Sequence, residues 1–375
     1  MNGVNKNSIR WLGVDTGGTF TDFVLYDGQG LRVHKVLSTP HAPEQAILQG
    51  IRELGLRPGE LRVTHGSTVA TNAVLERKGV RTAYITNRGL GDVLTIGRQA
   101  RRELYNLQPA PQPPPVPREL CLEVAARTGA DGRPIESLTE ADREAIQAAI
   151  ATHRPEAVAI NLLFSFLDDR DERTIASWLP DTIFISCSAD VLPEYREYER
   201  GIATWLNAWV GPRVAGYLER LGAALAPAPV AVMQSSGGTI SAAQAAGKAV
   251  QLLLSGPAGG LMGARFAGQQ AGFRRLLTFD MGGTSTDVAL IDGEIRLTPE
   301  GRIGDWPVAV PMVDMHTIGA GGGSLARVED GGLLQVGPES ASADPGPACY
   351  GRGGSLPTVT DANLVLGRLQ ADAFL

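Results

Sequence analysis

Eight residues with the pattern D-x-G-G-T-x-T-D occur twice in this chain of 375 residues. The copies read DTGGTFTD at residues 15–22 and DMGGTSTD at residues 280–287. Adjacent glycines let backbone N–H groups approach an anion closely, because no Cβ atom blocks them. Threonine adds hydroxyl donors without negative charge, and aspartate suits a hydrated Mg²⁺ that bridges phosphates or a water that must be oriented. The pattern therefore favours phosphate and metal chemistry.

Each copy taken alone also has a simpler interpretation. Asp-Gly and Gly-Gly pairs form hairpin turns, and threonine is an ordinary strand residue. Turn formation does not, however, require aspartate and threonine at the same offsets in both copies. The repetition therefore favours a functional site over two unrelated turns.

Short apolar runs on both sides of each copy predict how it is held. Trp11, Leu12 and Val14 precede the first copy, and Leu276, Leu277 and Phe279 precede the second. A Gly-rich turn between two short apolar runs predicts a β-hairpin. Dinucleotide and P-loop sites place their glycines between a strand and a helix instead. We therefore expect two facing half-sites, one on a hairpin in each half of the chain.

The remaining periodicity predicts an α/β fold. After the first hairpin, the order of strands and helices fits a mixed sheet with helices packed on it. A long helix at residues 195–225 carries Trp205 and Trp209 on one face, which predicts a core-facing pair and a connection between two domains. The expected domains are residues 1–195 and 196–375, and the second has too few elements to match the first, so we expect it to be incomplete. The other expected strands are residues 31–39, 61–65, 80–86, 156–164, 182–187 and 230–234, and the other expected helices are residues 43–54, 68–78, 138–153, 170–179 and 258–271.

Composition narrows the function classes. The chain carries 40 acidic and 34 basic side chains, for a formal net charge of −6, which argues against non-specific binding to nucleic acid or to an anionic membrane. Cys121, Cys187 and Cys349 are widely separated, so neither a disulfide framework nor a CxxC metal site is indicated. The first ten residues lack the apolar region of a signal peptide, and no apolar run has the length of a membrane span. We therefore expect a cytoplasmic protein.

Several segments resemble the A-type subunits of the hydantoinase/oxoprolinase family, which belongs to the actin-like ATPase superfamily. They extend from residue 15 to residue 354 and are DTGGTFTDFVLYD, THGSTVATNAVLERKG, VMQSSGGTISA, LLSGPAGG, FDMGGTSTDVALI, VPMVDMHTIGAGGGS and SADPGPACYGRGG. The resemblance implies duplicated actin-like ATPase domains of the ribonuclease H-like type. It also implies an adenine-binding element downstream of residue 375, and we do not assign GAGGGS at residues 319–324 to adenine.

The resemblance further implies ATP-dependent ring opening of a cyclic amide, such as hydantoin, N-methylhydantoin or 5-oxoproline. Phosphoryl transfer would convert the oxygen of a poorly electrophilic carbonyl into a leaving group. The implied cofactors are ATP and Mg²⁺ or another divalent metal, and the implied partner is a B-type subunit. The alternatives are an ATP-dependent ketone carboxylase subunit, a small-molecule kinase and a catalytically inactive nucleotide-binding or assembly protein. The cluster cysteines of iron–sulfur ATPase activators have no counterpart in this sequence.

Matching motifs assign the site residues. Asp15, Asp280 and His65 are the expected catalytic residues, although the sequence is equally compatible with a structural role for His65. Asp314 and His316 alternate like strand neighbours, and with Asp15 and Asp280 they are the expected metal ligands; the alternative is that both are polar surface residues. The remaining expected cofactor-binding residues are Thr16, Gly17, Gly18, Thr19, Thr21 and Asp22 in the first phosphate loop, Gly282, Gly283, Thr284, Thr286 and Asp287 in the second, and Ser67, Thr68, Asn72, Ser255, Gly256 and Gly259 at two helix starts that would face an anion.

Overall fold

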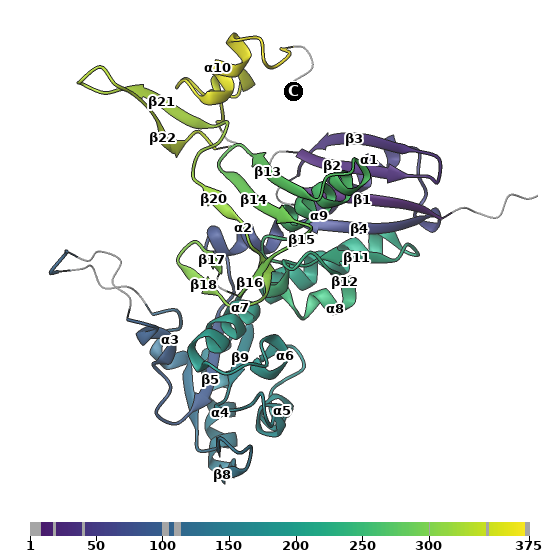
Figure 1. Cartoon of the computed structure of the whole chain (residues 1–375). Coiled ribbons are helices and arrows are strands. Elements are labelled where there is room, and N and C mark those ends of the chain that lie inside the picture. Colours follow the sequence, from purple (N-terminus) through teal and green to yellow (C-terminus); the bar gives the residue numbers. More distant parts are fainter. Residues whose placement is uncertain are drawn as a thin grey trace, which may run out of the picture.

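The computed structural model describes residues 9–17, 20–39, 42–99, 105–108, 114–299, 301–342 and 345–371. Gly18 and Thr19 of the first predicted phosphate loop lie outside these ranges. Two sheets lie towards opposite ends of one long helix, and a third sheet lies beside the first (Figure 1). None of the helices in the described ranges has both the length and the apolar character needed to cross a bilayer.

The first sheet has six strands in the order β12-β11-β4-β1-β2-β3. β1 runs antiparallel to β2 and parallel to β4, so the first glycine-rich pattern closes a hairpin at one end of this sheet. Helix α1 (Pro43–Glu53) packs against the sheet, and a Cβ atom added to its Gly50 would lie 2.2 Å from the Phe23 ring. The strands are β1 (Arg10–Thr16), β2 (Phe20–Tyr26), β3 (Leu31–Leu37), β4 (Leu61–Ser67), β11 (Val230–Met233) and β12 (Thr239–Ser241).

The second sheet is parallel throughout, in the order β10-β9-β5-β6. Every residue of β9 is buried, as expected for a parallel strand covered on both faces. Helix α4 (Glu140–His153), expected at residues 138–153, begins with a capping box in which Thr139 and Asp142 exchange hydrogen bonds. The strands are β5 (Thr82–Asn87), β6 (Cys121–Val124), β9 (Ala157–Asn161) and β10 (Phe184–Cys187), and the neighbouring elements are α3 (Val93–Ile96), α5 (Arg170–Ser177), α6 (Ser188–Val191) and the small hairpin β7 (Arg127–Thr128) and β8 (Pro134–Glu136).

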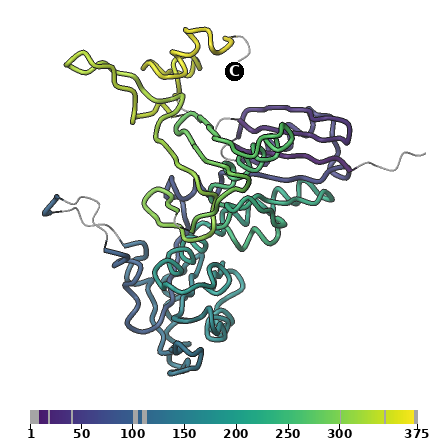
Figure 2. Tube along the Cα trace, viewed as in Figure 1, coloured from purple at the N-terminus to yellow at the C-terminus, as the bar shows by residue number. Residues whose placement is uncertain are grey.

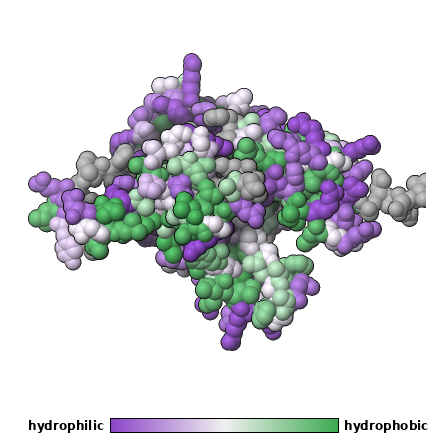
Figure 3. All heavy atoms as spheres, turned by 90° about the horizontal axis from the view of Figure 1, so that it is seen from above, coloured by the Kyte–Doolittle hydropathy of each residue, from purple (hydrophilic) through white to green (hydrophobic). Residues whose placement is uncertain are grey.

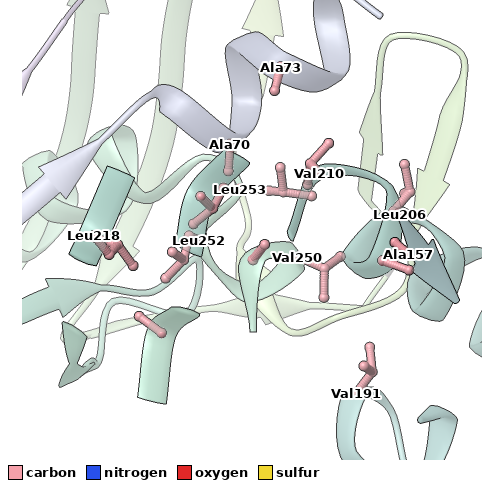
Figure 4. Packing of buried hydrophobic residues seen from close by; sticks show 14 of the residues in the cluster. Ala70, Ala73, Ala157, Val191, Leu206, Val210, Leu218, Val250, Leu252 and Leu253 are labelled. Atoms are coloured by element: carbon pink, nitrogen blue, oxygen red, sulfur yellow. The ribbon is translucent and has the colours of Figure 1, made fainter. Parts of the chain in front are cut away.

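The long helix α7 (Glu197–Leu225) joins the two sheets into one core. It packs against β9 and β10 of the second sheet and also against α1 and α2 (Val69–Leu75) beside the first. Figure 4 shows Val210 of α7 close to Ala70 of α2 and to Leu253, which follows the short helix η3 (Ala249–Leu252). The rings of Trp205 and Trp209 stack at 5.0 Å, so the predicted core-facing pair is confirmed.

A short hairpin extends the tryptophan cluster. It consists of β17 (Gly301–Ile303) and β18 (Trp306–Val308). Its Trp306 ring meets Trp205 edge-on at 4.9 Å. Offset and edge-to-face aromatic contacts of this kind add to the stability supplied by apolar burial alone.

The third sheet contains the second glycine-rich pattern. It is built from β13 (Arg275–Met281), β14 (Thr286–Asp292), β15 (Glu294–Ile295) and β20 (His316–Ile318). Helix α9 (Ser255–Gln270) packs against it, and a separate small core forms between them from Ala258, Leu261, Ala289, Ile291 and Val313. The remaining elements are η1 (Pro58–Glu60), η2 (Arg118–Leu120), α8 (Ala242–Ala246), β16 (Leu297–Thr298), β19 (Met312–Val313), β21 (Ser324–Val328), β22 (Leu334–Ser340), η4 (Ala348–Tyr350) and α10 (Val359–Val365).

Some element boundaries differ from those expected. β4 continues to Ser67 rather than ending at His65, because Gly66 and Ser67 still pair with β1. α2 ends at Leu75 rather than near Lys78, because the chain turns left-handed at Arg77. α9 starts three residues earlier than expected, since the ring of Pro257 fits the first turn of a helix, where no N–H donor is needed.

The expected division at residues 195 and 196 passes through the first core. α7 and β11 both follow residue 195, yet α7 packs against elements that precede it and β11 hydrogen-bonds to β4. Figure 2 shows the same arrangement, with the teal segment after residue 200 lying beside the purple N-terminal trace. The sheet that carries the first hairpin therefore needs segments from both expected domains.

Apolar side chains also reach the surface of the third sheet. Leu277, Phe279 and Leu290 are more than half exposed. Figure 3 shows apolar and polar atoms intermixed on the face of the molecule that is turned upwards in Figure 1. The face of this sheet is therefore covered only in part by the described residues.

Candidate functional site

The two glycine-rich patterns fold into hairpins of the same local geometry. Asp15 pairs with Asp22 across the first hairpin, and Asp280 pairs with Asp287 across the second. The Gly17 N–H donates to the Phe20 carbonyl at 3.0 Å, and the equivalent Gly282 N–H donates to the Ser285 carbonyl at 2.9 Å. The prediction of two matching β-hairpins is therefore confirmed.

The tertiary structure brings the first aspartates of the two hairpins close together. The pKa of Asp15 is raised above its ordinary value, first by loss of hydration and then by the negative charges of Asp22 and Asp280. Asp22 has a cationic partner, since its Oδ1 lies 3.1 Å from Lys35 Nζ. A cation between Asp15 and Asp280 would therefore relieve a repulsion that the protein itself leaves in place.

The donor set suits Mg²⁺ held together with phosphates. Within the described ranges, no group of three or more histidine, cysteine, aspartate or glutamate side chains is arranged to hold a metal ion unaided. Mg²⁺ is commonly bound by one or two carboxylates, with water and phosphate oxygens completing its octahedron. Asp15 and Asp280 match that requirement, and the ion would neutralise phosphate charge.

Two glycines make room for the Asp15 carboxylate. A Cβ atom on Gly66 of β4 would lie 3.0 Å from Asp15 Oδ1, and one on Gly256 in the first turn of α9 would lie 3.5 Å from it. The Ser255 hydroxyl donates to the Ser67 carbonyl at 3.0 Å, which fastens this end of α9 to the end of β4. The positive end of the α9 dipole thus lies beside the site, where it favours an anion.

The turn between β4 and α2 completes this side of the site. The Thr68 hydroxyl donates to the Thr16 carbonyl at 2.9 Å, and Ser67 Oγ accepts the Val69 N–H at 3.2 Å. The Asn72 amide donates to Thr68 Oγ1 at 3.4 Å. The predicted residues Ser67, Thr68 and Asn72 therefore do gather at the first hairpin.

Two predicted phosphate donors are committed to the hairpins themselves. Thr21 and Thr286 occupy equivalent positions and are both buried. The Thr21 hydroxyl shares a 3.0 Å hydrogen bond with Ser38, and the Thr286 hydroxyl donates to the Ala320 carbonyl at 2.6 Å. This arrangement favours a bracing role for both hydroxyls over the phosphate contact we expected.

The second turn itself is open to solvent. Gly282, Gly283 and Thr284 are all exposed. Gly259 differs, because it lies against Met233 of β11 and is a packing position. Of the residues expected to bind phosphate in the second half of the chain, these turn residues are therefore accessible to a ligand.

A glycine-rich segment that we did not predict to belong to the site supports the second turn. The N–H groups of Gly322 and Gly323 donate to the carbonyls of Gly282 and Gly283 at 2.9 and 2.6 Å. A Cβ atom on Gly321 would lie 2.7 Å from the Gly282 carbonyl oxygen. The run of three glycines at residues 321–323 was the available sequence signal, because only glycine permits such close backbone approach.

His65 lies behind the site rather than in it. Its side chain is fully buried, and its Nε2 is 2.6 Å from the Tyr217 hydroxyl on α7. Burial lowers the pKa of His65 to about 4, against a small opposing effect of the Val14 backbone. This position favours the structural alternative over the expected catalytic role.

The predicted ligands Asp314 and His316 are not brought to the carboxylates. Asp314 precedes β20, so the two residues do not share one strand as expected. His316 lies opposite Val288, whereas Thr317 lies opposite Asp287 and donates to its Oδ1 at 2.7 Å. Adjacent strand residues face opposite sides, so His316 is directed away from the face that carries Asp287.

A largely apolar cavity of about 410 Å³ adjoins the carboxylates of the second hairpin. It lies between α9 and the hairpin, and Leu261 and Phe279 are among its apolar lining residues. Asp280 and Asp287 form part of the same lining. A ligand with one apolar and one charged end would fit this combination.

Comparison with protein families identifies two regions. The family described as "Hydantoinase/oxoprolinase N-terminal region" matches residues 11–183, and "Hydantoinase/oxoprolinase" matches residues 200–375. Caprolactamase subunit alpha of Pseudomonas jessenii is 39% identical, over 99% of this chain and 56% of its own length. The 5-oxoprolinase of Saccharomyces cerevisiae is 33% identical, over 99% of this chain and 32% of its own length.

Solved structures show the same fold. The ATP-dependent caprolactamase from Pseudomonas jessenii superposes with a TM-score of 0.80 at 36% identity, over 96% of this chain and 55% of that one. Nucleotide-free acetone carboxylase gives a TM-score of 0.80 at 29% identity, with the same coverage. The chain thus spans just over half the length of these proteins and has an α/β fold of actin-like ATPase domains. It belongs to the hydantoinase/oxoprolinase family.

Proposed function

We propose that this chain uses ATP to activate the carbonyl group of a cyclic amide, so that water can open the ring. The observation that carries the proposal is the pair of matching hairpins, whose first aspartates lie near enough for the charge of Asp280 to raise the pKa of Asp15. The names of its relatives support it, since caprolactamase and 5-oxoprolinase are among them.

The proposed chemistry balances in three steps and consumes two water molecules. The amide carbonyl oxygen attacks the γ-phosphorus, an O–P bond forms, and ADP leaves. A first water adds to the activated carbon, and the C–N bond then breaks with a proton transferred to the nitrogen, which leaves an amine and an acyl phosphate. A second water hydrolyses the acyl phosphate and gives the carboxylic acid and phosphate. Because an amide carbonyl is a poor electrophile, the first step supplies the activation that the addition of water needs, and it also supplies the phosphate that leaves in the last step.

The chain's own residues contribute position and charge balance. In the exposed turn of the second hairpin, the N–H groups of Gly283 and Thr284 and the Thr284 hydroxyl would donate to phosphate oxygens, whereas the Gly282 N–H is already bonded to the Ser285 carbonyl. Asp15 and Asp280 would hold Mg²⁺, which offsets negative charge on the phosphates when bound. Gly66 and Gly256 leave room for the Asp15 carboxylate in this role.

We also propose a B-type partner subunit and a cytoplasmic location. Relatives named caprolactamase subunit alpha and acetophenone carboxylase gamma subunit support the proposed partner, because each name implies an assembly. The carboxylase names also favour a second candidate function, ATP-dependent carboxylation of a ketone. Both candidates begin with phosphoryl transfer to an oxygen atom.

Purification of the chain with and without a co-encoded B-type subunit tests these functions. ADP release and ring-opened product are measured with hydantoin, N-methylhydantoin, 5-oxoproline and caprolactam, and separately with ketones plus bicarbonate. Asp15→Asn and Asp280→Asn should each lower ATP-dependent turnover by about 100-fold, since a preorganised charge interaction is lost. Full turnover in both variants, or no detectable ATP binding by calorimetry, would contradict the proposal. Bicarbonate-dependent product in place of ring opening would favour the carboxylase.

A further inference from the structure

The exposed turn of the second hairpin has two N–H groups that find no acceptor among the described residues. They belong to Gly283 and Thr284. Both residues are exposed, so water or a ligand can reach these donors. The carbonyl groups of the same two peptide units are, by contrast, both hydrogen-bonded within the protein.

Peptide geometry fixes the direction in which these two N–H groups point. In a trans peptide unit, the C=O of one residue and the N–H of the next point in opposite directions. The Gly282 carbonyl accepts the Gly322 N–H at 2.9 Å, and the Gly283 carbonyl accepts the Gly323 N–H at 2.6 Å. Both carbonyls are therefore held against the glycine-rich segment, and the N–H groups that follow them are directed away from it, towards solvent.

Thr360 holds the peptide unit that lies behind this turn. It is the second residue of α10 and is 8% exposed. Its N–H donates to the Gly322 carbonyl at 2.7 Å, and its hydroxyl donates to the same oxygen at 2.9 Å. Because a carbonyl oxygen has two lone pairs, these two bonds use its full capacity. The N–H of the same peptide unit is that of Gly323, which points the opposite way and reaches the second turn.

These hydrogen bonds form one continuous relay. It begins at Thr360, passes through the peptide units 322–323 and 283–284, and ends at the Thr284 N–H. Hydrogen bonds in series polarise one another, so a bond accepted at one end of a peptide unit strengthens the donor at its other end. The relay therefore orients the Thr284 N–H and also makes it a better donor to an anion.

Glycine is needed where the relay passes from one segment to the next. A Cβ atom on Gly322 would lie 2.6 Å from the Thr360 hydroxyl oxygen, and one on Gly323 would lie 2.9 Å from the Gly283 carbonyl oxygen. Approaches this close are possible only where no Cβ atom is present. Helix capping does not account for the Thr360 hydroxyl, because the reciprocal bonds of the residues 358 and 361 already cap α10.

We propose that Thr360 is a positioning residue for phosphate binding, and that it acts on the second turn through Gly322 and Gly323. The inference rests on the proposed function and adds to it a residue that contacts neither phosphate nor substrate. A hydroxyl at position 360 keeps the relay intact. An apolar side chain of the same shape leaves the Gly322 carbonyl with one donor in place of two and weakens the Thr284 N–H as a donor.

A phosphate ligand without adenine provides the test. Binding of Mg·tripolyphosphate to the whole chain is measured by calorimetry, and the amide resonances of Gly283 and Thr284 are followed by NMR in protein with isotope-labelled glycine and threonine. Thr360→Val should weaken binding about tenfold, as expected for loss of one buried hydrogen bond, and should reduce the movement of both resonances. Thr360→Ser keeps the hydroxyl and should restore both.

Thr86→Val is the matched control. The buried Thr86 hydroxyl donates to the Asn161 carbonyl at the same distance of 2.9 Å, but it lies in the second sheet. Its loss should leave the binding of Mg·tripolyphosphate unchanged. Thr360→Ala removes the hydroxyl without a β-branched side chain, so it gives the same expected loss if Thr360→Val does not fold.

Any of four results would contradict this role of Thr360. They are no binding of Mg·tripolyphosphate by the wild type, equal binding by the variants that lack the hydroxyl, a loss that Thr360→Ser does not restore, and the same loss in Thr86→Val. Failure of the proposed function is distinguishable from these results, because it would leave the Thr360-dependent binding intact while ATP-dependent ring opening is absent.

Discussion

At the scale of single residues, Asp15 illustrates how distant segments set the chemistry of one side chain. Its charge is disfavoured by burial and by Asp22 and Asp280. Its neighbours Gly66 and Gly256 come from β4 and α9. A carboxylate kept in such surroundings destabilises the free protein, which is common where a group is held ready for a ligand.

Asp15→Asn should therefore raise the melting temperature of the ligand-free protein at pH 7. The raised pKa means that the folded state holds the proton more tightly than the unfolded chain, so the carboxylate lowers stability as the pH rises above its ordinary value of 3.8. The gain should disappear below pH 3.8, where the carboxyl group is protonated in both states. Thermal unfolding monitored by circular dichroism at pH 3 to 8 would measure it.

The same measurement tests metal binding without any catalysis. Mg²⁺ should raise the melting temperature of the wild type but not of Asp15→Asn. Asp181→Asn is the matched control, because Asp181 is an exposed aspartate shortly before β10 of the second sheet. This variant should respond to Mg²⁺ like the wild type. An equal Mg²⁺ response in all three proteins would remove Asp15 from the metal site.

His65 should make the protein less stable in weak acid. Its folded pKa of about 4 lies below the ordinary 6.5, so the unfolded chain binds the proton first and the unfolding free energy falls as the pH drops from 6.5 towards 4. His65→Gln should flatten this part of the stability profile, measured by urea unfolding. An unchanged profile would mean that the ring is not buried in its neutral form.

At the scale of elements, the glycines of residues 321–323 act by letting two backbones touch. A Cβ atom added to Gly321 would lie 2.7 Å from the Gly282 carbonyl oxygen, whereas a Cβ atom added to Gly319 would meet nothing within 4 Å. Gly321→Ala should therefore displace the second turn and cost about 1–3 kcal/mol, a range typical of overpacking. Gly319→Ala should be nearly neutral, apart from a small change in chain entropy.

Urea unfolding and Mg·ATP titration together would check this pair. Gly321→Ala should weaken Mg·ATP binding, and Gly319→Ala should not. Equal effects of the two substitutions on both measurements would show that the second turn does not depend on the close backbone contact.

At the scale of the whole molecule, the two hairpins rest on cores of very different size. The first hairpin belongs to the large core that spans both sheets around α7, whereas the second rests on a small core of its own. Opening free energy depends on local burial, so the two regions should open independently.

Hydrogen exchange should detect this difference. Amides of β13, where most side chains are exposed, should exchange faster than those of the fully buried β9. Mg·ATP should slow exchange in β13 and β14, because a ligand between the hairpins stabilises the less stable partner. Equal exchange in β9 and β13, or no effect of Mg·ATP on the second hairpin, would contradict this account.

The sequence by itself determined the local parts of this protein. The two hairpins, the capping box at Thr139 and the tryptophan pair on α7 all follow from residues within a few positions of one another. Strand pairing across a Gly-Gly turn and stacking at helical spacing are short-range effects, so pattern alone predicts them.

Only the tertiary structure decided which parts of the chain meet. It brought Asp280 near Asp15 and the glycines of residues 321–323 into contact with the second turn. It also buried His65 next to Tyr217 and paired β11 with β4 in the first sheet. These contacts join segments far apart in the chain, and their formation depends on the packing of whole elements. Local periodicity does not reveal which distant segments pack together or which polar residues become buried. The two glycine-rich hairpins could therefore be predicted from the sequence. The residues that position these hairpins, hydrogen-bond to them or shift the pKa of their aspartates could not.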